Sequence, residues 1–323
     1  MENWNQLGED DKRMNFFPPA DIAGAACGAS AKKATISFGK LFILGILAGA
    51  YIGFGANLAC VVSNDLPKYL GNGFAQLVFG AVFSTGLMLV VIGGAELFTG
   101  NNMFMMIGAL NGDCTWGDLL KNWVVVWIAN LVGSLLLVYI VAGGFYGFFD
   151  PAAGKGLFGG AVGVKALNVA KGKLELTWNA AFCRAILCNW LVCMAVWLAL
   201  ASKDVVGKVF GIFFPIMAFV ASGFEHSVAN MFFIPMGLVV SHIPAILDAA
   251  AQASLTAPQL ADPAAAAAAA AAFKASVAGS FTWGNLFIKN LVPVTLGNIV
   301  GGAIFVASFY WYSYLQKGSA APK

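Results

Sequence analysis

Six long apolar runs constrain this sequence more than any other feature. A run of about 20 apolar residues forms a helix long enough to cross the ~30 Å hydrocarbon core of a bilayer. Of the 323 residues, 60% are hydrophobic and only 10% are charged, whereas a soluble domain carries about 25% charged residues. The sequence therefore predicts an all-α integral membrane protein with six transmembrane helices. The predicted spans are 38–62, 74–110, 119–145, 178–201, 209–240 and 286–314.

Two of these runs are interrupted by polar residues, and the interruptions match. The second run contains Gly-Ala-Glu at 94–96 and Asn-Met-Phe at 102–104. The fifth contains Gly-Phe-Glu at 223–225, followed by His226, and Asn-Met-Phe at 230–232. Ionisable side chains at membrane depth are energetically costly and point to function. Matching breaks in two halves indicate a transport site near the bilayer midplane, with helices 2 and 5 both broken there.

A second internal match divides the chain into two repeats. Thr-Trp-Gly-Asp at 115–118 recurs as Thr-Trp-Gly-Asn at 282–285, and Asn-Leu-Val-Gly at 130–133 recurs as Asn-Ile-Val-Gly at 298–301. The third and sixth runs therefore correspond, as the second and fifth do. Because each unit has three spans, the second copy is expected to be inverted relative to the first. The predicted divisions are repeat 1 at 38–145, a loop at 146–177 and repeat 2 at 178–315.

The segments outside the spans predict an orientation. Lysine and arginine cluster at or before the start of the first run, which favours a cytoplasmic N-terminal segment at 1–37, with an amphipathic helix at 20–37. Six spans then place the C-terminus inside and the 146–177 loop outside, where its four lysines form a positive mouth that attracts anions. An alanine-rich insertion at 244–281 is expected to be an exposed helical segment, and residues 316–323 form a polar tail.

The first run carries three glycines at a spacing of four residues: Gly45, Gly49 and Gly53. Small residues at this spacing let two helix backbones approach closely. The spacing fits packing within the chain as well as it fits a subunit interface.

Several strings resemble the formate/nitrite transporter family. Gly-Ala-Glu-Leu-Phe-Thr-Gly-Asn at 94–101 resembles its second-span loop, and Phe-Glu-His-Ser-Val-Ala-Asn-Met at 224–231 resembles its fifth-span break; shorter strings at 167–170 and 187–189 also fit. The resemblance implies a homopentamer in the cell membrane, with an aquaporin-like protomer and one pore per protomer. The implied substrates are small monovalent anions of weak acids. The 224–235 run is most similar to formate-transporting members, with nitrite and hydrosulfide as alternatives.

Such a pore needs a side chain that donates a proton or a hydrogen bond to the anion. A bare anion in a low-dielectric pore loses its hydration at a large cost in free energy. Histidine is the side chain whose charge changes most readily near neutral pH. We therefore expect His226 to donate a proton or hydrogen bond, Thr99 to face it from the other loop, and Lys173 to attract the anion at the outer mouth. The alternatives are a buried structural histidine, a threonine that supports its loop, and a solvated loop lysine.

The resemblance also implies two apolar constrictions. Phe83, Leu87 and Phe219 are expected to form the inner one, and Leu97, with Phe98 beside it, the outer one. The sequence by itself shows only ordinary apolar residues at these five positions.

Four further polar residues lie near the breaks. Asn189 and Asn230 are candidate pore residues, with the alternative that they tie loops and helices together. Glu96 and Glu225 are expected to structure the loops by capping the backbone N–H groups that each break frees.

Other function classes find little support in the sequence. The six cysteines show no Cys-x-x-Cys pair, so no metal or cofactor is predicted. His226 and His242 lie 16 residues apart in one run, so they do not supply a pair of histidines on two helices that could hold a haem. The net charge of +3 is too small to imply a nucleic-acid partner. No enzyme constellation is present. An aquaporin-like neutral-solute channel is the alternative from another class, and Arg184 has no assigned role.

Overall fold

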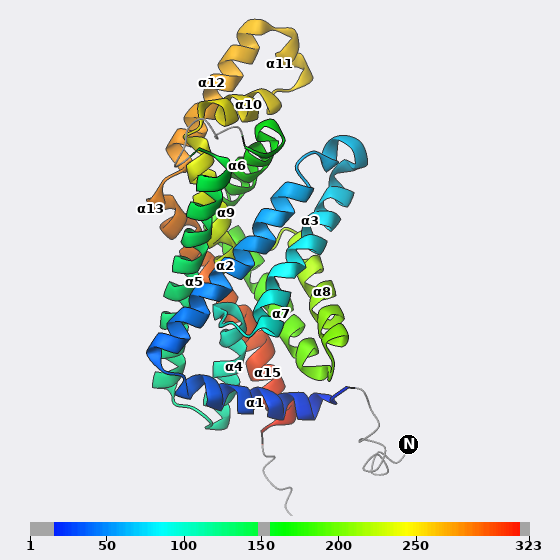
Figure 1. The fold of residues 1–323 in the computed structure, drawn as a ribbon, viewed down its shortest axis with the longest axis vertical. Helices are drawn as coiled ribbons and strands as arrows, with labels where there is room; N and C mark the ends of the chain where they lie inside the picture. The colour runs from blue at the N-terminus through cyan, green and yellow to red at the C-terminus, as the bar shows by residue number, and fades with distance from the viewer. Residues whose placement is uncertain (1–15, 148–155, 317–323) are drawn as a thin grey trace, which may run out of the picture.

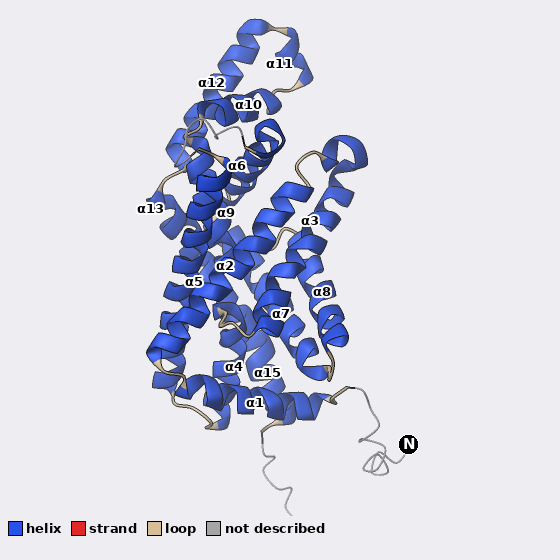
Figure 2. Cartoon of the chain, viewed as in Figure 1, coloured by secondary structure: helices blue, strands red, loops and turns tan. Residues whose placement is uncertain are grey.

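The computed structural model describes residues 16–147 and 156–316, and nearly all of them are helical (Figure 2). Within these ranges, five helices are long and apolar enough to cross a membrane. They are α2 (Phe38–Val62), α3 (Leu66–Gly93), α5 (Trp116–Phe145), α7 (Trp178–Ala201) and the composite helix Trp283–Tyr314. The prediction of an all-helical protein with several membrane-spanning helices is confirmed.

The composite helix near the C-terminus contains two stretches of π-helix. It consists of α13 (Trp283–Asn285), η5 (Leu286–Leu291), α14 (Val292–Ile299), η6 (Val300–Ser308) and α15 (Phe309–Tyr314). The π-helical stretches are η5 and η6. π-Helical turns are rare and frequently lie at functional sites.

The predicted runs at 74–110 and 209–240 are each divided between two helices. α3 is followed by α4 (Phe98–Asn111), and α8 (Val205–Ala221) is followed by α9 (Ser227–Ser241). The chain turns at Gly94, with φ +82°, after α3, and at Gly223, with φ +70°, after α8. Only glycine adopts this left-handed conformation without steric cost, so these two residues end α3 and α8 and redirect the chain.

The number of membrane crossings remains a prediction. α8 has only 17 residues, fewer than any of the five long helices. α9 and α10 (Pro244–Ala253) meet at an angle of 104°, and the described helices give six spans by length and composition if this bent pair is counted as one.

Two short helices lie far apart in the molecule, one at the bottom of Figure 1 and one in its upper part. α1 (Pro19–Thr35) corresponds to the helix predicted at 20–37 and packs against α4. α6 (Ala161–Leu174), preceded by the short turn η4 (Leu157–Gly160), packs against α9. Each short helix therefore lies against one of the two helices that follow a break.

The glycines of the first run pack within the chain, where α2 meets α5. A Cβ atom at Gly49 would lie 2.0 Å from the Asn130 carbonyl oxygen, and one at Gly133 would lie 1.9 Å from the Ile46 carbonyl oxygen. A Cβ atom at Gly45 would lie 2.5 Å from the Ala129 Cβ. The two backbones are therefore in direct contact, and only glycine fits at the crossing.

The alanine-rich segment is helical and projects beyond α6 (Figure 1). It comprises α10, α11 (Ala257–Ala261) and α12 (Pro263–Ser280). The ion pair between Lys274 and Asp248 joins α12 to α10, and Val277 is the buried side chain of α12. α10 packs against α6 and α9, and α12 also contacts α6.

Candidate pore site

Two cavities are lined by the two breaks. The His226 cavity has a volume of about 310 Å³ and includes residues of the second break. The Leu97 cavity has a volume of about 270 Å³ and includes residues of the first. The polar and charged lining residues of the His226 cavity are Gln76, Lys165, Asn168, Lys173, Glu225 and His226. Those of the Leu97 cavity are Lys33, Glu96, Asn101 and Lys208.

His226 and Thr99 join the two breaks through a direct contact. The Nε2 atom of His226 lies 3.0 Å from the Thr99 Oγ1, and both side chains are buried. Nδ1 of His226 accepts the backbone N–H of Ala229 at 3.0 Å. Because Nδ1 is an acceptor, the proton of the neutral ring is on Nε2, which donates to Thr99. The prediction that these two residues face each other agrees with this geometry.

Two asparagines hold the breaks in place. Asn298 Nδ2 donates to the carbonyl oxygens of Ala185 and Glu225, each at 2.9 Å, and Oδ1 accepts the Ser227 N–H at 2.9 Å. Asn298 thereby ties α7, the second break and the start of α9 to α14.

Asn130 plays the matching part at the first break. Its Nδ2 donates to the carbonyl oxygens of Gly45 at 2.8 Å and Glu96 at 2.9 Å, and its Oδ1 accepts the Phe98 N–H at 2.9 Å. The repeated Asn-x-x-Gly string was visible in the sequence, but its role as the tether of each break was not predicted.

A buried polar chain runs beside each break. At the second break, Lys173 Nζ lies 2.9 Å from Glu225 Oε1, Glu225 Oε2 accepts from Asn230 at 2.6 Å, and Asn230 donates to Asn290 at 2.7 Å. The Lys173 charge is therefore balanced by an acid, which the interpretation as a solvated or anion-attracting lysine did not anticipate.

The first break has the same chain of groups. Lys33 Nζ lies 2.7 Å from Glu96 Oε1, Asn101 donates to Glu96 Oε2 at 2.8 Å, and Asn101 also donates to Asn122 at 2.8 Å. Lys33, Asn122 and Asn290 were missed from the sequence. The repeated Lys-Asn pairs at 121–122 and 289–290 were the available signal for the two asparagines.

The predicted capping role of Glu96 and Glu225 was wrong in its detail. Their carboxylates bind lysine and asparagine side chains, whereas the freed N–H groups at the helix starts are capped by Asn130, Asn298 and the His226 ring. Both oxygens of each carboxylate are occupied by a lysine and an asparagine side chain, and other side chains cap the helix starts.

The predicted constriction residues fall into different groups from those expected. Phe83 and Phe219 form an edge-to-face pair with centroids 6.0 Å apart, and both line the His226 cavity. Leu87 lines the Leu97 cavity together with Leu97. The expected inner set of Phe83, Leu87 and Phe219 is therefore divided between the two cavities.

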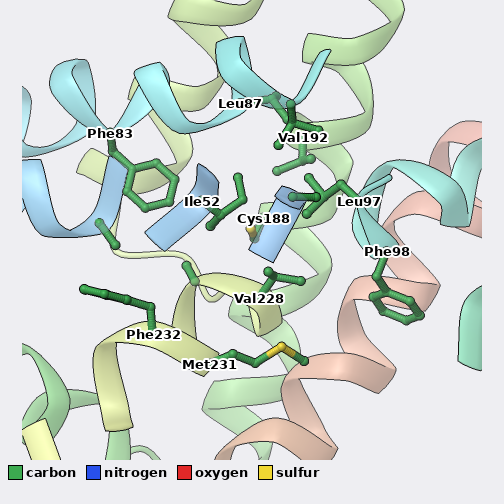
Figure 3. Packing of buried hydrophobic residues seen from close by; sticks show 14 of the residues in the cluster. Ile52, Phe83, Leu87, Leu97, Phe98, Cys188, Val192, Val228, Met231 and Phe232 are labelled. Atoms are coloured by element: carbon green, nitrogen blue, oxygen red, sulfur yellow. The ribbon is translucent and has the colours of Figure 1, made fainter. Parts of the chain in front are cut away.

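Phe98, predicted to stand beside Leu97 at the outer constriction, lines neither the His226 cavity nor the Leu97 cavity. Its ring packs edge-to-face on Trp123, with centroids 6.4 Å apart, and lies apart from Leu87 and Leu97 in Figure 3. It lines an apolar groove together with Trp127 of α5 and Ile299 of α14. As the first residue of α4, Phe98 takes the helical phase that directs its side chain to α5.

Asn189 and Asn230 act as ties and line neither cavity. Asn189 Nδ2 donates to the carbonyl oxygens of Thr99 at 3.2 Å and Asn298 at 2.7 Å, and to Asn102 Oδ1 at 3.1 Å. Asn230 belongs to the buried chain beside the second break.

The two remaining unusual side chains lie at the surface. Arg184 is exposed on α7, although its carbonyl oxygen accepts the Glu225 N–H at 3.3 Å. His242 is exposed at the C-terminal end of α9, and its Nδ1 lies 2.8 Å from the Leu238 carbonyl oxygen.

The structure combines several apolar helices with two cavities and with a buried histidine–threonine contact where the two breaks meet. These features define a membrane channel or transporter. A model of the formate/nitrite transporter family matches residues 20–312. The chain belongs to this family, which confirms the resemblance seen in the sequence. It is accordingly a multi-pass membrane transport protein and not an enzyme.

Relatives agree with this assignment over nearly the whole chain. A probable formate transporter of Methanothermobacter thermautotrophicus is 46% identical over 94% of this chain and 99% of its own length. The formate channel FocA of Escherichia coli (strain K12) is 36% identical over 95% of this chain and 98% of its own length. The uncharacterized transporter YrhG of Bacillus subtilis (strain 168) is 40% identical over 94% of this chain.

Solved structures show the same architecture. A pentameric formate channel with formate bound aligns with a TM-score of 0.68 and 34% identity, covering 86% of this chain and 98% of that one. An ion channel of the same family aligns with a TM-score of 0.69 and 28% identity, covering 91% of this chain and 98% of that one.

Proposed function

We propose that this chain conducts formate across the cell membrane through a pore of its own. The observation that carries the proposal is the His226–Thr99 contact, which places a ring N–H donor at the meeting point of the two breaks. Relatives named as a probable formate transporter and as a formate channel support this choice of substrate. The route runs from the His226 cavity, past His226 and Thr99, to the Leu97 cavity.

In the proposed mechanism the pore attracts the anion, donates a hydrogen bond or a proton to it, and excludes water around it. Lys173 lines the His226 cavity and contributes to binding the anion there. Phe83 and Phe219 narrow the route on that side, and Leu87 and Leu97 narrow it on the other, so that the anion sheds water between them. His226 then supplies a hydrogen bond or a proton from Nε2, which offsets the loss of hydration.

Helix ends add positive potential at the same point. α4 begins at Phe98, next to Thr99, and α9 begins at Ser227, next to His226. The N-terminal end of a helix carries a partial positive charge that favours an anion. Both broken helices therefore direct this end toward the donor site.

The membrane arrangement in this proposal has six crossings in two inverted three-span repeats, with α3–α4 and α8–α9 as the two broken spans. The matched contacts of Asn130 and Asn298 support the repeat, because each ties one break to the helix of its own half. In this arrangement both termini are cytoplasmic and the His226 cavity opens outward, toward the loop that carries α6.

The proposed assembly is a homopentamer with one pore in each protomer. The similar solved structure is a pentameric formate channel. Large apolar side chains are exposed along α5 and α14, including Leu120, Val124, Val292 and Leu296. A membrane protein covers such surfaces with lipid or with a neighbouring protomer.

Uptake into liposomes tests the substrate. Purified protein is reconstituted, and uptake of formate, nitrite, hydrosulfide and glycerol is compared with uptake into empty liposomes. We expect all three anions to enter above the empty control, with formate fastest, and glycerol to stay at the control rate. Faster nitrite or hydrosulfide would favour the alternative substrates of the family, and glycerol uptake without anion uptake would contradict an anion channel.

A further inference from the structure

Lys165 is a cavity-lining lysine without an acidic partner among the described residues. It lies on α6 and lines the His226 cavity, with its Nζ 5.5 Å from the centre of the Phe79 ring. The described part of the chain gives it no salt bridge and no hydrogen bond. The ring face supplies its one close favourable contact, a cation–π interaction.

The other lysines near the two cavities all have an oxygen partner. Lys173 pairs with Glu225, and Lys171 on the same helix pairs with Glu175. In the Leu97 cavity, Lys33 pairs with Glu96, and Lys208 donates to the Ala199 carbonyl oxygen at 2.9 Å. Lys165 therefore differs from each of them, because none of the described residues supplies an oxygen partner for its ammonium group.

The charge of the His226 cavity depends on this residue. Among its described lining residues, Lys165 and Lys173 are cationic and Glu225 is the carboxylate. Because Glu225 is paired with Lys173 at 2.9 Å, the uncompensated positive charge belongs to Lys165. Lys165 is half-buried, and this burial lowers the pKa of its ammonium group below the ordinary value. A charge in this setting attracts an anion more strongly than one in bulk solvent.

The position of Lys165 suits a first contact on the way to His226. Phe79 stacks on Phe233, with centroids 5.9 Å apart, and Lys165 lies over the first ring while Lys173 lies 5.4 Å from the centre of the second. The two ammonium groups thus each lie over one ring of a stacked aromatic pair within the same cavity.

We propose that Lys165 forms an anion-binding subsite in the His226 cavity, separate from the Lys173–Glu225 pair. Its ammonium group, with the amide of Asn168 one turn further along α6, binds a small monovalent carboxylate or oxyanion before that anion reaches His226. The subsite rests on the proposed function for its transported ligand. The cation itself is a property of the cavity and is testable without transport.

Transport kinetics test the subsite in three variants. The initial rate of formate uptake into liposomes is measured against formate concentration for Lys165→Gln, Lys165→Arg and Lys171→Gln. Removing one partly exposed charge should raise the half-saturating concentration of Lys165→Gln about two- to fivefold at low ionic strength. The maximal rate should stay unchanged, and the shift should shrink at about 1 M salt, where the screening length is ~3 Å.

The two other variants are the controls. Lys165→Arg retains the charge and should stay within a factor of about two of the wild type, which also shows that the site tolerates substitution. Lys171→Gln removes a charge from the same helix that already has a partner outside the cavity lining, so its half-saturating concentration should not change. An unchanged Lys165→Gln, or equal shifts in Lys165→Gln and Lys171→Gln, would overturn the proposal.

Bromide separates this proposal from the question of formate transport. Crystals of the wild type and of Lys165→Gln are soaked in bromide, whose anomalous scattering locates it directly. We expect a bromide peak beside the Lys165 ammonium group that is missing in Lys165→Gln. A wild type that takes up no formate but binds bromide at Lys165 would reject the transported substrate and retain the subsite. A wild type without that peak would reject the subsite.

Discussion

Asn298 shows how strongly one side chain can determine a break between helices. It makes three buried hydrogen bonds to backbone groups of α7, the break and α9. Without it, the Ser227 N–H and the Glu225 carbonyl lose their partners, and each buried unpaired group costs about 1–3 kcal/mol. We expect Asn298→Ala to lower the free energy of unfolding by about 3 kcal/mol, seen as a lower thermal midpoint in detergent.

Asn111→Ala is the matched control for this prediction. Asn111 is exposed and donates to Asp113 at 2.9 Å, so its removal should shift the midpoint little. Equal midpoints for Asn298→Ala and Asn111→Ala would mean that the break does not depend on this tether.

At the residue scale, the sequence predicted chemistry better than it predicted contacts. The glutamate, histidine and threonine of the two breaks were identified as site residues, and Thr99 and His226 do meet. The partners of Asn298 lie up to 113 residues away, and their identity depends on tertiary packing that a repeat in the sequence does not encode. The packing of Phe98 on Trp123 was not predicted for a related reason, because the position of a residue in a motif does not determine which side of the helix it lies on.

At the element scale, the crossing of α2 and α5 depends on the absence of a side chain at Gly49. An added methyl group would lie 2.0 Å from the Asn130 carbonyl oxygen, a backbone atom with no room to move. Overpacking of this kind costs about 1–3 kcal/mol. We expect Gly49→Ala to lower the thermal midpoint and to reduce the yield of assembled protein, measured by size-exclusion chromatography.

Gly24→Ala in α1 provides the comparison. A Cβ atom at Gly24 has no neighbour within 4 Å, and alanine is favoured over glycine inside a helix by about 1 kcal/mol. This variant should be as stable as the wild type or more so. If Gly49→Ala behaved like Gly24→Ala, the close approach of α2 and α5 would be disproved.

The boundaries of the elements were predicted unevenly. The runs at 38–62 and 178–201 coincide with α2 and α7, because there the apolar stretch and the helix are the same length. α3 instead starts at Leu66, eight residues before the apolar run, and contains a non-helical residue at Gly71. Hydropathy identifies only the apolar part of a helix. The helical residues of α3 that precede its apolar run were therefore not predicted.

At the scale of the whole molecule, the two halves are alike in structure and unlike at the donor site. Both halves have an asparagine tether and a lysine–glutamate–asparagine chain. The residue after Glu225 is His226, whereas the residue after Glu96 is Leu97. The two repeats thus share the same supporting contacts around each break. They differ in the residue after the glutamate, and the second repeat alone places a donor ring where the breaks meet.

The central claim is that His226 supplies the hydrogen bond or proton that lets formate pass. It is tested most directly by measuring formate uptake into liposomes against outside pH, for the wild type and His226→Asn. The wild type should take up formate faster as the outside pH falls, and His226→Asn should lose this flux or carry it as net charge movement. Uptake by His226→Asn with the rate, pH profile and anion selectivity of the wild type would contradict the account and leave His226 a structural residue.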